Sequence, residues 1–149
     1  MNPAHIHLML NHFGIIGSIF VAALLAVAMV RRSRELTMVA FACVTAIALI
    51  SIVVYFTGEP ASHQVEKYPE VSAQAIHQHE EVANFGFAAI ECVGALALAG
   101  LWLFRKEPVP RWFLMITLVG SLLTIVAMFY TANSGRDIRH PEVRSRVFS

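Results

Sequence analysis

The chain has 149 residues, of which 57% are apolar and 14% are charged, and its formal net charge at pH 7 is +1. Long apolar runs with few charges exclude an ordinary soluble domain and are typical of membrane spans. The near-neutral charge argues against nucleic acid as a partner. The two cysteines, Cys43 and Cys92, lie inside apolar runs. This placement excludes a disulfide framework and a zinc-binding spacing.

Four apolar runs follow one another along the chain, at residues 8–30, 36–56, 82–104 and 112–130. Each has roughly 19–23 residues, which at about 1.5 Å per residue crosses a hydrocarbon core of about 30 Å. Because lipid offers the backbone no hydrogen bonds, such spans are expected to be α-helical. The first run is too long for a cleavable signal, so we expect it to be retained. The sequence predicts an all-α integral membrane protein, a single up-down bundle of four helices.

The short connections at 31–35 and 105–111 hold six of the eleven basic residues. By the positive-inside rule both connections are cytoplasmic and both termini are non-cytoplasmic. The four arginines of the polar tail, residues 131–149, oppose this assignment. Between the second and third runs, residues 57–81 are predicted to form an outer loop and a helix extension. The second helix should stop at the Thr-Gly-Glu-Pro of residues 57–60, and the third should restart near Ser72.

All seven histidines fall on the side opposite the basic connections. Four polar residues, one on each span, lie 24 to 26 residues from the nearest basic connection: His7, Glu59, His79 and Arg136. At about 1.5 Å per residue, their heights differ by only a few ångströms. We therefore expect a layer of His, Glu and Arg at the outer end of the bundle.

Imidazole and carboxylate together form a ligand set for first-row transition metals such as iron, copper and zinc. Helical bundles hold such metals with inward-facing His and Glu on different helices. The candidate ligands are those of the polar layer and its flanks, namely His12, Glu59, His77, His79, Glu80, His140 and Glu142. Two helical residues subtend 200°, so His77 and His79 can share one centre only if the helix is irregular there. The alternative is a polar rim in water with no ligand role.

A b-type haem is the other cofactor hypothesis, and it needs two histidines facing each other from different spans. His7 or His12 would come from the first span, and His79 would come from the third. Three small residues below them would leave room for a porphyrin or would serve ordinary helix packing: Gly14, Gly17 and Gly86.

Two arginines of the outer layer, Arg136 and Arg139, would pair with haem propionates. The abundance of Glu favours a non-haem metal. The membrane setting favours haem, because electron transfer to quinone is common in membranes. The choice between the two cofactors stays open at this point.

Glu91 lies near the middle of its span, 14 residues from Arg105. Hydrocarbon disfavours a charged side chain, so such a residue is a functional candidate by default. We expect a neutral carboxylic acid there that transfers protons toward the outer layer, or one that only ties helices together. Candidate hydrogen-bond partners at the same depth are Ser18, Thr45, Ser51 and Thr124.

Short motifs along nearly the whole chain carry a resemblance: residues 10–13 with Gly17, 57–59, 79–81 and 138–142. Together they resemble a family of small bacterial membrane proteins with four spans, grouped as a domain of unknown function. The resemblance implies the bacterial cytoplasmic (inner) membrane and little about activity. It also implies that the polar residues within these motifs are the functional positions. This favours a ligand role for His12, Glu59, His79, Glu80, His140 and Glu142.

The favoured function is electron transfer in the membrane through a b-type haem or a transition metal, with quinone as a candidate partner. A non-redox metal-binding or transport protein is the second hypothesis. An accessory structural subunit of a larger membrane complex is the third. A homo-oligomer would fit any of the three. Because no phosphate loop or nucleotide fingerprint occurs, no phosphoryl-transfer chemistry is expected.

Overall fold

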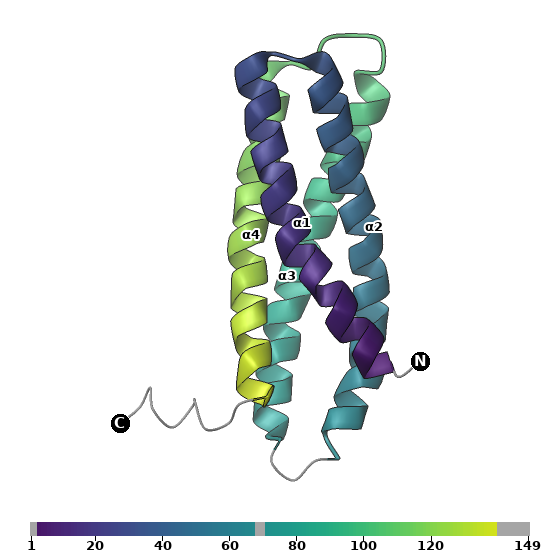
Figure 1. The fold of residues 1–149 in the computed structure, drawn as a ribbon, viewed down its shortest axis with the longest axis vertical. Coiled ribbons are helices and arrows are strands. Elements are labelled where there is room, and N and C mark those ends of the chain that lie inside the picture. The colour runs from purple at the N-terminus through teal and green to yellow at the C-terminus, as the bar shows by residue number, and fades with distance from the viewer. Residues whose placement is uncertain (1–2, 68–70, 140–149) are drawn as a thin grey trace, which may run out of the picture.

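The computed structural model is a bundle of four α-helices that run alternately up and down (Figure 1). The structure describes residues 3–67 and 71–139, without the side chains of residues 3–9, 11, 64–65, 136–137 and 139. Each helix packs against its neighbours in the sequence, and α1 also packs against α4, which closes the ring. The predicted four-helix bundle is confirmed. The helices are α1 (Pro3–Arg31), α2 (Arg34–Val65), α3 (Ala73–Leu103) and α4 (Arg111–Arg139).

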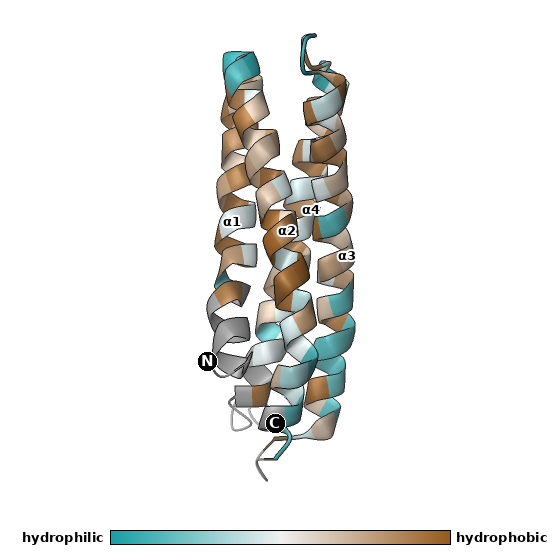
Figure 2. Cartoon of the chain, turned by 90° about the vertical axis from the view of Figure 1, so that its right-hand side faces the viewer, coloured by the Kyte–Doolittle hydropathy of each residue, from teal (hydrophilic) through white to brown (hydrophobic). Residues whose placement is uncertain are grey.

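The outer surface of the bundle is as apolar as its inside. Phe20, Phe56 and Leu123 are 59%, 71% and 64% exposed, respectively. So much exposed apolar surface is unfavourable in water and is what hydrocarbon requires. Figure 2 shows hydrophobic residues along the middle of the helices and hydrophilic ones at the top loops and along the lower part of α3. All four helices are long and apolar enough to cross a membrane, so the chain is a multi-pass membrane protein.

The two short basic connections lie at the same end of the bundle, which we call the basic end. Ser33 caps α2 there, because its hydroxyl accepts a hydrogen bond of 3.2 Å from the backbone N–H of Leu36. The Arg34 guanidinium reaches the carboxyl end of α3, donating to the carbonyl oxygens of Phe104 (3.3 Å) and Arg105. A cation at a helix carboxyl end is stabilised by the exposed carbonyls. The opposite end, where α1 begins and α4 ends, is the terminal end.

The apolar core lies toward the basic end. Phe41 and Phe113 meet edge to face there, with ring centroids 5.8 Å apart. Gly100 makes room for them, since a Cβ at this position would lie 2.6 Å from the Phe41 ring and 2.8 Å from the Phe113 ring. The buried core residues are Val21, Leu25, Ala40, Phe41, Val44, Val93, Ala97, Phe113 and Leu114.

One predicted helix end is wrong. α2 continues to Val65, and Pro60 lies inside the helix rather than ending it. A proline fixes φ at a helical value and removes only one N–H donor. Beyond it Ala61 is 8% exposed, so packing stabilises the extension. The restart of the third helix is confirmed, because α3 begins at Ala73 with Ser72 as its N-cap residue.

Candidate functional site

His79 is the histidine that the fold directs toward a neighbouring helix at the terminal end. Its side chain is half-buried, and its Nδ1 lies 2.9 Å from the hydroxyl oxygen of Ser134 on α4. The Ser134 hydroxyl in turn lies 2.9 Å from the carbonyl oxygen of Thr131, to which it donates. A hydroxyl has one proton, so both contacts form together only when the Nδ1–H of His79 donates to Ser134. In the neutral ring this tautomer puts the lone pair on Nε2, the form in which histidine ligates a metal.

The contacts around this histidine hold α3 and α4 close together. The Thr131 hydroxyl lies 3.3 Å from the carbonyl oxygen of Val82 and 3.0 Å from that of Ala127, linking the two helices. The His79 ring lies over Gly135, where an added Cβ would be 3.2 Å from the ring's Cε1. The ring is therefore held by a hydrogen bond on one edge, and the absence of a side chain at Gly135 leaves room for it.

His77 faces away from this site, as the helical phase predicts. Its side chain is 72% exposed, and its Nδ1 lies 3.8 Å from a carboxylate oxygen of Glu81 on the same helix. α3 is a continuous helix through both residues. His77 therefore lies outside the His79 site, and the two histidines do not share one centre in this structure.

The other predicted ligands either lie apart from one another or are not among the residues that the structure describes. His12, Glu59 and Glu80 are exposed. Among the described side chains, no three from His, Cys, Asp and Glu lie close enough together to hold a metal ion. The predicted positions that fall outside the description are the side chains of His7, Arg136 and Arg139, and the residues His140 and Glu142. Among the predicted ligands, His79 is one that a hydrogen bond to another helix orients.

The glycines that would leave room for a porphyrin are used for helix packing. Met128 of α4 fills the space between α1 and α3, since its Sδ lies 3.4 Å from a Cβ position on Gly14 and its Cε lies 2.7 Å from one on Gly86. Ile47 similarly fills the space beside Gly17, at 2.8 Å. The described interior at this level therefore does not fit a haem between the first and third helices.

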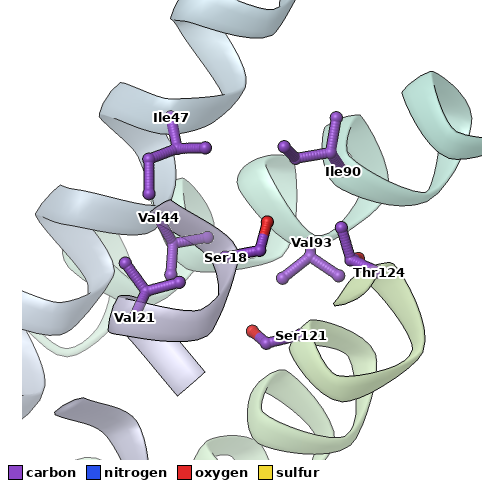
Figure 3. A pocket seen from close by; sticks show the side chains of 8 residues that line it. All are labelled: Ser18, Val21, Val44, Ile47, Ile90, Val93, Ser121 and Thr124. Atoms are coloured by element: carbon purple, nitrogen blue, oxygen red, sulfur yellow. The ribbon is translucent and has the colours of Figure 1, made fainter. Parts of the chain in front are cut away.

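A small cavity of about 10 Å³ lies at the centre of the bundle, between residues contributed by all four helices (Figure 3). That volume is at the lower limit for a single water molecule. Three hydroxyls reach this cavity, from Ser18, Ser121 and Thr124, and each donates to the carbonyl four residues earlier in its own helix, at 2.6, 2.8 and 3.0 Å. The cavity is too small for an organic ligand, so it belongs to the packing of the bundle.

Glu91 meets α2 in the middle of the membrane-spanning region. Its Oε1 is hydrogen-bonded to the Ser51 hydroxyl. Of the four partners expected from depth, Ser51 makes this contact, whereas Thr45 donates to the carbonyl of Phe41 in its own helix at 2.9 Å. The other two, Ser18 and Thr124, line the central cavity. A polar contact between α2 and α3 therefore lies in the apolar region, well away from His79.

Comparisons with protein-family models, with curated proteins and with solved structures found no match. Ser134 and Thr131, which orient His79, were not singled out from the sequence. The sequence signal that points to these two residues is their depth along the bundle. Counting residues places Arg136 level with His79, and Ser134 lies two residues before Arg136.

Proposed function

We propose that this protein binds a redox-active transition metal, iron or copper, at the terminal end of its bundle and uses it for electron transfer in the bacterial cytoplasmic membrane. The observation that supports the proposal is the orientation of His79 by Ser134. Metal-ligating histidines generally donate their second ring N–H to a fixed acceptor, which sets the tautomer and the ring direction. An interfacial histidine without a ligand role needs no such support.

The further ligands are drawn from the predicted set. His140 and Glu142 follow α4 directly in the sequence and carry the imidazole and carboxylate that complete a mixed site. Haem is the competing hypothesis and the weaker one, because Met128 fills the space between Gly14 and Gly86. Quinone is the proposed electron partner, since it is a redox carrier that dissolves in the membrane. In the proposed orientation the basic end is cytoplasmic.

The test is elemental analysis of the detergent-purified protein, with absorption and electron paramagnetic resonance spectra before and after reduction by dithionite. We expect bound iron or copper with a spectrum that changes on reduction. His79→Ala should lose the metal, whereas His77→Ala should keep it. The two variants carry the same substitution two residues apart on opposite faces of α3.

Three outcomes would contradict the proposal. Bound zinc with no redox-active spectrum would indicate a non-redox metal-binding or transport protein. A Soret band that shifts on reduction would establish haem in place of a non-haem metal. Wild-type protein without metal or haem would leave the accessory structural subunit as the better explanation.

A further inference from the structure

Glu91 is unusual among the residues of the membrane-spanning stretches. In residues 13–30, 36–58, 82–104 and 112–135, it is the one Asp, Glu, Lys or Arg. No cation in these stretches is therefore available to neutralise a carboxylate. A charged side chain without a partner is costly in hydrocarbon, and such residues mark ion or proton sites.

The packing of α2 against α3 brings Ser51 to this carboxyl. The two helices pack tightly at Ala48 and Gly94, where an added Cβ on the glycine would lie only 2.3 Å from the alanine Cβ. The helices are antiparallel, so moving three residues along α2 and three back along α3 leads to Ser51 and Glu91. One further turn leads to Tyr55 and Phe87, whose rings stack with centroids 4.3 Å apart.

The Ser51 hydroxyl has one proton and lies near two hydrogen-bond acceptors. Its oxygen lies 2.8 Å from the carbonyl oxygen of Ala48 and also contacts Oε1 of Glu91. When Glu91 is a neutral acid, its O–H donates to Ser51, and Ser51 donates to Ala48. When Glu91 is a carboxylate, the Ser51 O–H turns to the carboxylate and leaves the Ala48 carbonyl with its helical hydrogen bond. The same serine thus gives Glu91 a partner in either protonation state.

The other titratable groups near this pair are one phenol and two thiols. Tyr55 lies one turn away on α2 with its ring against Phe87, and Cys92 follows Glu91 on α3. Cys43 lies two turns toward the basic end on α2, and α4 has no titratable residue between Arg111 and Tyr130. Among the described hydrogen-bond contacts of the Glu91 carboxyl, Ser51 is therefore its side-chain partner.

We propose that Glu91 is a reversible proton-binding site inside the membrane, with Ser51 as its hydrogen-bond partner in both forms. Release of the proton breaks the carboxyl O–H bond and passes the proton to water, while the Ser51 hydroxyl turns from Ala48 to the carboxylate. The bound species is a proton rather than a metal cation, because one carboxylate and one hydroxyl are too few oxygens for a hard cation. This site is independent of the metal proposed at His79.

Infrared spectroscopy of the full-length protein in lipid tests the proposal, because a protonated carboxyl absorbs above the amide band and shifts in D₂O. We expect this absorption in the wild type and its reversible loss when the proton is released. Glu91→Gln should remove it. Glu81→Gln is the matched control, an exposed carboxylate on the same helix, and should leave the absorption unchanged.

A second pair of variants tests the role of Ser51. Ser51→Ala removes the hydroxyl that contacts the carboxyl, so the frequency of the carboxyl absorption should change, because this frequency depends on the hydrogen bonds that the carboxyl makes. Ser121→Ala removes a hydroxyl that donates within α4 at 2.8 Å and should leave the absorption unchanged. The proposal is overturned if wild-type protein lacks a carboxyl absorption that Glu91→Gln removes, or if both serine variants absorb like wild type.

Discussion

The basic half and the terminal half of the bundle use the same four helices but are held together differently. Near the basic end, rings and branched side chains from all four helices form a dry core around Phe41 and Phe113. Toward the terminal end, no residue of α2 from 49 to 60 is buried, and neither is any described residue of α1 from 10 to 17. There, polar contacts such as Ser51–Glu91 and His79–Ser134 join the helices. The largest apolar cluster lies in the basic half, whereas polar contacts between helices supplement apolar packing in the terminal half.

This difference predicts that the largest loss of stability follows from changes in the basic half. Phe41→Ala should lower the free energy of unfolding by about 3 kcal/mol, because Phe41 is 0% exposed and its removal leaves a cavity. The control is Phe129→Ala, which truncates a ring of α4 that is 58% exposed and should cost far less. Unfolding by denaturant in mixed micelles measures both. Equal losses would show that the core is not concentrated near the basic end.

The boundary between the halves is expected to be sensitive to the size of residue 94. Gly94→Ala should destabilise the protein by about 1–3 kcal/mol, because the new Cβ would lie 2.3 Å from the Ala48 Cβ and would force α2 away from α3. Gly14→Ala is the matched control, because its Cβ would lie 3.4 Å from the flexible end of Met128. Thermal unfolding compares the two variants.

A compensating change sharpens this prediction. Ala48→Gly in the Gly94→Ala background should restore most of the lost stability, because it removes the methyl group that the new Cβ meets. The coupling between the two sites is read from a double-mutant cycle. Additive effects would mean that the two residues do not limit the approach of α2 to α3.

In the terminal half we expect a smaller effect on stability and a larger one on metal binding. Ser134→Ala removes one hydrogen bond from the half-buried His79, which should cost about 0.5–1.5 kcal/mol of stability. If His79 is a ligand, metal affinity should also fall by about 10–100-fold, because the ring loses its orienting partner. Ser62→Ala is the control, since this exposed hydroxyl only donates to Glu59 of its own helix at 2.9 Å. Metal titration of the three proteins distinguishes local orientation from general destabilisation.

The fold was predictable because hydrophobic length is a strong signal in membrane proteins. Four apolar runs, two basic connections and the restart of a helix near Ser72 all match the structure. The helix end at residues 57–60 was not predictable, since one proline breaks a helix only if nothing packs beyond it, and Ala61 is buried there. Counting residues from the basic connections places both Ser51 and Thr45 at about the depth of Glu91. The count does not tell which of these hydroxyls contacts the Glu91 carboxyl, because that depends on the close approach of Ala48 to Gly94.

The depth of the site residues along the bundle was predictable from the sequence, but the directions in which their side chains point were not. Counting residues placed several His and Glu side chains in one layer, yet height does not say which of them face another helix. His77 and His79 illustrate the difference, because they are two residues apart and only His79 contacts α4. Contact with Ser134 depends on the register of α3 against α4, which the glycines at 86 and 120 set by close packing.

The smallest effect is therefore expected at His77. Its contact with Glu81 is exposed, at 3.8 Å, and pairs of this kind on a helix surface stabilise by roughly 0.2–0.5 kcal/mol. His77→Ala should change stability by no more than that, and added salt should reduce the difference further because exposed charges are screened. Thermal unfolding at low and high salt measures it. A loss as large as that of Ser134→Ala would mean that His77 makes a contact beyond Glu81 and that the terminal end is organised by both faces of α3.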